Sequence, residues 1–178
     1  MNLNFQILKN KLQNLDQLRS YMNQESNWIF QFGFFTRECP LSLLESNPEL
    51  IKLIFEHKGK AHFLKLESWK LYNLHMDIPR KIAINSVLQG FDCYTFFTDH
   101  IPNLEKEAFS DVVELTYDEG DIVMLNVARP HGLYNRYQTR VILSLSFNSL
   151  DYTEMYQYLL EEQLIEPRNP HPYGLATE

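Results

Sequence analysis

The chain has 178 residues, of which 44% are hydrophobic and 22% charged, a composition typical of a soluble globular protein. Its net charge of −7 disfavours a nucleic-acid partner, because an acidic surface has no broad attraction to phosphate backbones. Two cysteines without a Cys-x-x-Cys spacing argue against a disulfide scaffold or a cysteine-rich zinc site. No stretch approaches ~20 apolar residues and no apolar leader is seen, so we expect a cytoplasmic protein without a membrane partner.

The first third of the chain is predicted to be mostly helical. From Asn4 to Gln24, apolar residues recur every three or four positions, which is typical of an amphipathic helix. The aromatic run 28–35 predicts a strand instead. Helical sequence resumes from Pro40 to about His57, with Pro48 expected at the first position of a helix.

From residue 60 onward the hydrophobic pattern changes to the alternation that is typical of β-strands. Short strands are expected within 61–71, 83–88, 93–97, 112–117, 122–125 and 139–147. A tight turn at 118–121 predicts a hairpin between 112–117 and 122–125. The sequence from Asp151 to Leu164 predicts a C-terminal helix, followed by a proline-containing tail.

Roughly eight strands between two helical regions predict a mainly β (α+β) fold. We expect a double-stranded β-helix, which is a cupin-like jelly roll, with flanking helices at both ends. In this prediction residues 1–178 form one domain. It comprises a helical N-terminal region 1–57, a β-helix core at about 60–148, and a C-terminal helix and tail at 150–178.

His75 and Asp77 are the first candidates for a metal site. They lie two positions apart at the end of a predicted strand, so their side chains project to the same side of an extended backbone. Pro79 ends that strand or confines it to a sheet edge. His131 follows Pro130 at a strand boundary and is the expected third ligand, from a distant part of the chain.

Two histidines and one carboxylate form the facial ligand set of non-haem iron oxygenases. These ligands leave three positions of Fe(II) open, of which a 2-oxo acid can occupy two and O2 the third. A structural zinc site would instead be closed by four ligands. The triad of His75, Asp77 and His131 therefore predicts Fe(II) as the metal.

Arg140 opens the clearest strand of the sequence, whose two faces differ in chemistry. The face that is expected to pack outward carries Val141, Leu143, Leu145 and Phe147. The other face carries Arg140, Ile142, Ser144 and Ser146 and is suited to a ligand cavity. A guanidinium inside a barrel is costly unless a charge pairs with it, and the distal carboxylate of 2-oxoglutarate is a fitting bidentate partner. Considered alone, Arg140 could also pair with Asp77 or Glu114.

Two segments of the chain resemble one protein family. The run His75–Asn85 (HMDIPRKIAIN) is similar to the HxD segment of the 2-oxoglutarate/Fe(II) oxygenase superfamily. It is most similar to the aspartyl/asparaginyl β-hydroxylase-like branch, which also holds free-amino-acid hydroxylases. The run Leu125–Asn135 (LNVARPHGLYN), with the strand Arg140–Phe147 after it, resembles the distal segment of the same branch. The resemblance covers about residues 60–150.

The resemblance implies a double-stranded β-helix in which His75, Asp77 and His131 hold iron and Arg140 anchors 2-oxoglutarate. Other oxygenases of the superfamily carry Arg-x-Ser on the last strand, whereas Ile142 stands two positions after Arg140 here. A hydroxyl partner for the cosubstrate must then come from elsewhere, and the candidates are Ser86, Tyr94 and Thr95. The resemblance does not carry a substrate across.

Four further polar residues are candidates for supporting roles. Arg80 and Asn85 could contact cosubstrate or substrate, and a solvent-facing salt bridge is an equal alternative for Arg80. Asn126 and Asn135 flank His131 and favour turn formation, with orientation of His131 as the functional alternative.

The leading hypothesis is a 2-oxoglutarate-dependent dioxygenase that uses Fe(II) and O2 to hydroxylate a small molecule, a free amino acid or a peptide side chain. A first alternative is a cupin-type metal-dependent isomerase or lyase, which would use the same ligands but would have no need of Arg140. A second is a non-catalytic small-molecule-binding barrel that retains a vestigial site.

Overall fold

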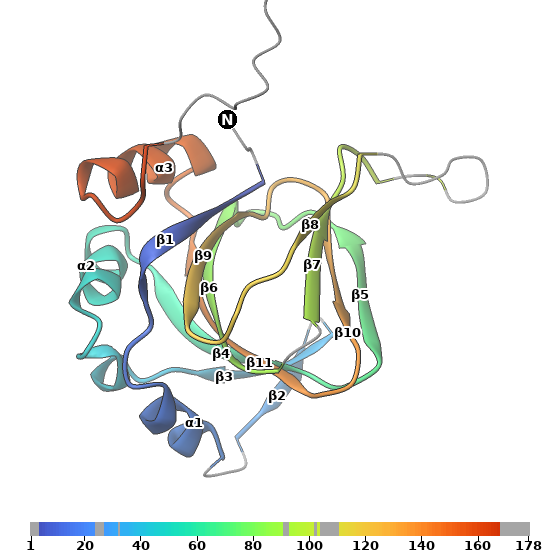
Figure 1. The fold of residues 1–178 in the computed structure, drawn as a ribbon, viewed down its shortest axis with the longest axis horizontal. Coiled ribbons are helices and arrows are strands. Elements are labelled where there is room, and N and C mark those ends of the chain that lie inside the picture. Colours follow the sequence, from blue (N-terminus) through green and yellow to red (C-terminus); the bar gives the residue numbers. More distant parts are fainter. Residues whose placement is uncertain are drawn as a thin grey trace, which may run out of the picture.

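A computed structural model describes residues 4–23, 27–31, 33–90, 93–101, 103 and 111–167. Within these ranges the strands form two antiparallel sheets that face each other (Figure 1). The larger sheet contains, in spatial order, β1 (Phe5–Lys11), β9 (Asp121–Asn126), β6 (Ile82–Gln89), β11 (Arg140–Phe147), β4 (Lys60–Leu66), β3 (Phe34–Glu38) and β2 (Ile29–Gln31). The smaller sheet contains β5 (Lys70–His75), β10 (His131–Asn135), β7 (Cys93–Phe97) and β8 (Val113–Leu115).

Helices cover the outer face of the larger sheet (Figure 1). They are α1 (Leu15–Asn23), a short 3₁₀ helix (Leu41–Leu44), α2 (Pro48–Glu56) and α3 (Tyr152–Glu161). α2 begins at Pro48, whose fixed backbone angle suits a first helical position. α3 begins with a capping box between Asp151 and Glu154. None of the described helices is long and apolar enough to cross a lipid bilayer.

β11 separates the main core from the interior of the barrel. Its outward side chains, Val141, Leu143, Leu145 and Phe147, are buried against the helices, as the alternation predicted. Each large apolar side chain buried in this way stabilises the fold by about 1.5–3 kcal/mol. The inward side chains of Ile142, Ser144 and Ser146 line a cavity instead.

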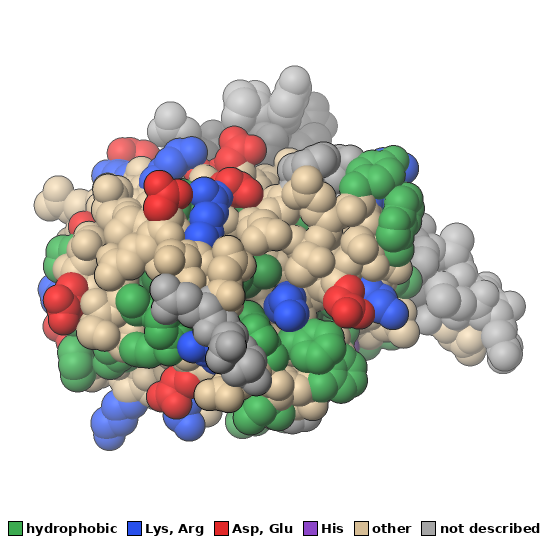
Figure 2. All heavy atoms as spheres, turned by 90° about the horizontal axis from the view of Figure 1, so that it is seen from below, with side chains coloured by type: hydrophobic (Ala, Val, Ile, Leu, Met, Phe, Trp, Pro, Cys, Tyr) green, Lys and Arg blue, Asp and Glu red, His purple; other side chains and the backbone are tan. Residues whose placement is uncertain are grey.

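A second apolar cluster fills part of the space between the two sheets. Its members are Ala83, Phe97, Leu115, Val123, Leu125 and Val127, with Phe5 and Tyr117 packed against them. The predicted mainly β fold, a jelly roll or double-stranded β-helix, is therefore confirmed. Figure 2 shows one face of the molecule, where Lys and Arg lie among acidic and apolar side chains instead of gathering into a broad basic surface.

The predicted helix over Asn4–Gln24 is wrong in its first half. Residues Phe5–Lys11 form β1, which pairs with β9 at the edge of the larger sheet. Phe5 packs toward the barrel interior, whereas Leu8 belongs to the core under the helices. The sheet edge determines the structure here, although the apolar spacing also fits a helix. Asn14, with φ of 55°, stands between β1 and α1.

Two further predictions for the N-terminal region are corrected. The single strand expected over 28–35 is a hairpin of β2 and β3, with Gly33 between them at φ of +83°. The helical region predicted over residues 1–57 therefore contains three strands.

The predicted hairpin of 112–117 and 122–125 is also wrong. β8 pairs with β7 in the smaller sheet, whereas β9 pairs with β1 and β6 in the larger one. The turn at 118–121 reverses the chain, as the sequence indicates, but it carries the chain from one sheet to the other. Its glycine, Gly120, donates a backbone hydrogen bond to Val87 of β6. The predicted tail after Pro167 lies outside the described residues.

Candidate metal centre

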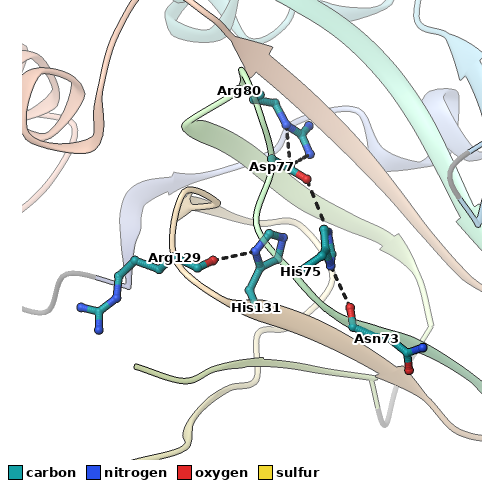
Figure 3. Close-up of polar contacts among 6 residues, drawn as sticks. All are labelled: Asn73, His75, Asp77, Arg80, Arg129 and His131. Atoms are coloured by element: carbon teal, nitrogen blue, oxygen red, sulfur yellow. Dashed lines mark hydrogen bonds and ion pairs between the residues drawn. The ribbon is translucent and has the colours of Figure 1, made fainter. Parts of the chain in front are cut away.

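The strand pairing brings His75, Asp77 and His131 to one point. β5 ends at His75 and β10 begins at His131, and these two histidines are direct partners across the antiparallel pair. Asp77 follows, held by a 2.9 Å hydrogen bond from its backbone N–H to the carbonyl of Val127. One potential ligand atom of each side chain lies within 4.8 Å of the others (Figure 3). The structure thus brings together the three residues that the sequence singled out.

Backbone carbonyls fix the orientation of both imidazole rings. His75 Nδ1 lies 2.8 Å from the carbonyl oxygen of Asn73, and His131 Nδ1 lies 3.0 Å from that of Arg129 (Figure 3). Because a carbonyl can only accept, each Nδ1 must carry the proton. In a ring that is neutral, the lone pair is then on Nε2, which is the atom that can bind a metal.

Asp77 is held as a carboxylate with its two oxygens in different roles. Oδ1 lies 3.4 Å from His75 Nε2. Oδ2 accepts hydrogen bonds from Arg80, one of them from Nε at 2.8 Å (Figure 3). Burial works against the charged form, but the hydrogen bond with His75 and the charge of Arg80 outweigh it and lower the pKa of Asp77 to about 2.

His131 is the most deeply buried of the three candidate ligands, with 5% of its surface exposed. Burial, together with the electrostatic effect of the neighbouring His75 ring, lowers the pKa of His131 to about 4. The ring is therefore neutral near pH 7 and needs no deprotonation before it can bind a metal.

The depressed pKa of His131 predicts a pH dependence of stability for the metal-free protein. The unfolded chain binds the proton below about pH 6.5 and the folded chain only below about pH 4, so lowering the pH across this window favours unfolding. The full loss across this window is about 3 kcal/mol. Urea unfolding of metal-free wild type and His131→Gln at several pH values measures it. If the free energy of unfolding fell equally with decreasing pH in both proteins, the pH dependence could not be assigned to His131.

Arg140 lies inside the barrel, and no ion pair joins it to an acidic residue in the described part of the chain. Only 2% of its surface is exposed. Its Nη2 donates to Tyr117 Oη at 2.6 Å and to Thr95 Oγ1 at 3.4 Å. Its Nε and Nη1 are buried without any hydrogen-bond partner. A buried cation with unpaired N–H groups is costly, so this geometry fits a site for an anionic ligand.

The alternative of an ordinary ion pair for Arg140 finds no support in the described part of the chain. Asp77 pairs with Arg80 and His75, and no ion pair joins Arg140 to Glu114. Of the three hydroxyl groups considered from the sequence, that of Thr95 contacts the guanidinium.

The sequence analysis did not identify Tyr117, which also contacts Arg140. The alternation of Val113, Leu115 and Tyr117 could have indicated it, since Leu115 faces the barrel interior.

One cavity reaches from the candidate metal ligands to Thr95, which contacts Arg140. It has a volume of about 490 Å³, which is within the usual range for small-molecule sites. His75, Asp77 and His131 line it, as do Thr95 beside Arg140 and the apolar Leu133 and Ile142. Two more residues predicted from the sequence, Arg80 and Asn85, also line it. The cavity thus extends from the candidate metal ligands to the neighbourhood of the buried guanidinium.

The structure places Asn126 in the turn before His131 and Asn135 at the far end of β10. The carbonyl of Asn126 accepts a hydrogen bond from Arg129, which forms the turn that leads to His131. Asn135 is fully buried at the opposite end of β10. Its Nδ2 donates to the carbonyls of Leu66 and Glu67, at 3.0 and 2.7 Å, and so ties β10 to the end of β4.

Asn135 is therefore expected to stabilise the fold and not the metal. Asn135→Leu leaves two buried carbonyls without this donor, and we expect a loss of about 2–4 kcal/mol in the free energy of unfolding. Chemical denaturation measures the loss, and Fe(II) affinity below the transition is expected to stay unchanged. A large fall in metal affinity with normal stability would instead support orientation of His131 by Asn135.

No protein-family model matches the sequence, and no curated protein matches it either. Solved structures do match in fold. The structure of HygX from Streptomyces hygroscopicus, with nickel and 2-oxoglutarate bound, gives a TM-score of 0.59 at 11% identity, over 85% of each chain. A Pseudomonas putida prolyl-4-hydroxylase gives 0.58 at 11% identity, over 82% of this chain and 92% of that chain.

A third match is a prolyl hydroxylase from Trichoplax adhaerens, solved with a peptide fragment of hypoxia-inducible factor. Its TM-score is 0.55 at 14% identity, over 88% of this chain and 87% of that chain. Identities this low show a shared architecture and carry no residue or substrate across. The chain therefore has the double-stranded β-helix fold found in 2-oxoglutarate/Fe(II) oxygenases.

Proposed function

We propose that this protein is an Fe(II)- and 2-oxoglutarate-dependent dioxygenase. The observation that carries the proposal is the pairing of two features in one barrel. His75, Asp77 and His131 converge as a 2-His-1-carboxylate set, and Arg140 presents unpaired N–H groups in the same interior. A cupin-type isomerase or lyase, or a vestigial barrel, would explain the first feature but gives no reason for the second.

In the proposed reaction one C–H bond of the substrate becomes C–OH. Molecular oxygen supplies one oxygen atom to the substrate and the other to succinate, while 2-oxoglutarate loses CO2 and provides two electrons. Bound Fe(II) would supply the O2 chemistry. The chain's own residues hold the reactants. The two imidazoles and the Asp77 carboxylate would bind the metal, and Arg140, with Thr95 and Tyr117, would anchor the distal carboxylate of 2-oxoglutarate.

The HMDIPRKIAIN and LNVARPHGLYN runs support a finer assignment to the aspartyl/asparaginyl β-hydroxylase-like branch, which we retain as a proposal. Because Asp77 engages the guanidinium of Arg80, we assign Arg80 to the support of this ligand and not to the cosubstrate. We propose that Arg80 holds Asp77 Oδ2 and so leaves Oδ1 for the metal. A cytoplasmic location also stays a prediction.

This role of Arg80 predicts a change in metal affinity. Arg80→Met is expected to weaken Fe(II) binding by about 10–100-fold, the usual effect of losing a residue that holds a metal ligand in place. Anaerobic titration with Fe(II) measures the change. Arg80→Lys keeps the charge but not the two-pronged contact. Its Fe(II) affinity is expected to lie between those of Arg80→Met and the wild type. Wild-type affinity in Arg80→Met would contradict the role.

Turnover of 2-oxoglutarate tests the proposed function. With Fe(II), O2 and 2-oxoglutarate, the wild type is expected to release succinate slowly even without a substrate. His131→Ala is the matched control and is expected to release none. No succinate from metal-loaded wild type would contradict an active oxygenase. Turnover that survives His131→Ala would contradict the assigned site.

A further inference from the structure

The wall of the cavity on the larger sheet contains buried polar atoms that nothing in the protein satisfies. Asn85 on β6 and Ser144 on β11 are 7% and 3% exposed, and both line the cavity. Asn85 Oδ1 and Ser144 Oγ have no hydrogen-bond partner. Buried polar atoms are nearly always paired in proteins, so two unpaired ones on one cavity wall indicate a ligand position.

Strand register places these atoms side by side. Ser144 is the direct partner of Asn85 on one side and of His62, on β4, on the other. His62 also lines the cavity. We call Asn85, Ser144 and His62 the polar row. Burial lowers the pKa of His62 more strongly than nearby Glu38 raises it, so the row is uncharged near pH 7.

The polar row is separate from the groups that would hold 2-oxoglutarate. The Arg140 guanidinium reaches Thr95 on β7 and Tyr117, away from β4 and β6. Ile142 lies between Arg140 and Ser144 on the inward face of β11. The proposed cosubstrate would thus lie along the smaller sheet, between Thr95 and the metal ligands, and the polar row faces it from the larger sheet.

Charge limits what the remaining space can bind. Arg80 is the one charged side chain, apart from the candidate metal ligands, among the described residues that line the cavity. It is paired with Asp77. A free amino acid would bring an ammonium and a carboxylate into a site that offers no further charged partner for either, and burying unpaired charges is costly.

The rest of the lining is polar but uncharged on one side and aromatic on the other. Thr36, Ser146, Gln31 and Asn148 add hydroxyl and amide groups. Phe34 and Tyr72 lie with ring centroids 4.5 Å apart and offer an apolar face to the C–H bonds of a ring. A Cβ at Gly33 would lie 2.6 Å from Tyr72, so the glycine leaves room for this ring.

We propose that the prime substrate is an uncharged, hydroxyl-rich small molecule, of the sugar or cyclitol class, whose hydroxyl groups bind the polar row. A hydroxyl both donates and accepts, so one such group can satisfy Asn85 Oδ1 and Ser144 Oγ together. This inference rests on the proposed oxygenase function and selects among the substrate classes that the sequence left open.

The test uses metal-loaded protein that already releases succinate without substrate, so its failure leaves the proposed function intact. Succinate release is measured with neutral sugars and cyclitols, with free amino acids, and with blocked tripeptides. We expect stimulation by members of the hydroxylated panel only. Stimulation by an amino acid or a tripeptide, or by no hydroxylated compound, overturns the proposal.

Variants test the polar row itself. Ser144→Ala and Asn85→Leu are each expected to raise about tenfold the concentration of the stimulating compound that gives half-maximal stimulation of succinate release. Ser86→Ala is the matched control. Its hydroxyl is equally buried and unpaired, but it lies outside the cavity lining, between the outward-facing Ile84 and Leu88. Unchanged stimulation in both test variants, or an equal effect of Ser86→Ala, overturns the role of the row.

Discussion

Asp77→Ala is expected to weaken Fe(II) binding by more than about 100-fold, beyond the usual effect of losing a residue that only supports a ligand. The substitution removes the one carboxylate of the candidate ligand set and leaves the two imidazoles. It also leaves the Arg80 guanidinium without its partner beside the site, where its charge repels a cation. Anaerobic competition against a chelator measures the affinity.

Two controls separate this effect from general damage. Asp99→Ala removes a carboxylate that pairs with Arg129 and is 60% exposed, so wild-type affinity is expected. His62→Ala removes a cavity histidine outside the triad and is also expected to retain the metal. Wild-type affinity in Asp77→Ala, or an equal loss in either control, would show that the metal is bound elsewhere.

Arg140→Met is expected to weaken 2-oxoglutarate binding by about 100-fold or more, because a two-pronged charge-assisted contact is lost. Fe(II) affinity should be retained, since Arg140 has no contact with the triad. We also expect the ligand-free variant to melt no lower than wild type. The Arg140 guanidinium is buried with two unpaired nitrogens, so replacing it by an apolar side chain of similar length removes a desolvation cost.

Arg129→Met is the matched control for Arg140→Met. The Arg129 side chain pairs with Asp99, and its contribution to the site is the backbone carbonyl, which the substitution keeps. Isothermal titration of the metal-loaded proteins gives both affinities. Undiminished binding of 2-oxoglutarate by Arg140→Met would contradict the anchoring role, and a large loss of stability would indicate a structural role instead.

The positions of two of the three candidate ligands were predictable because they depend on the backbone of one short segment. Two side chains on an extended segment project to the same side whenever they lie two positions apart, which brought His75 and Asp77 together. The two faces of β11 were equally predictable from alternation. His131 required an inference about a distant segment, and the structure provides it through the direct partnership of His131 and His75.

The parts that sequence reasoning missed depend on partners far along the chain. Phe5–Lys11 fits a helix or a strand by spacing, and only its pairing with β9 decides between them. The turn at 118–121 was correctly located, but a turn signal does not say which sheet receives the next strand. The contact of Tyr117 with Arg140, and the lack of partners for Asn85 Oδ1 and Ser144 Oγ, depend on the three-dimensional packing of the barrel, which sequence alone does not give.

Anaerobic titration of the Fe(II)-loaded protein with 2-oxoglutarate, followed by visible absorption, tests the central claim most directly. A weak charge-transfer band should appear in the wild type and saturate with added 2-oxoglutarate. It should be absent in His131→Ala and should require a much higher concentration in Arg140→Met. No band in the wild type, or an unchanged titration in Arg140→Met, would contradict a 2-oxoglutarate site built from these residues.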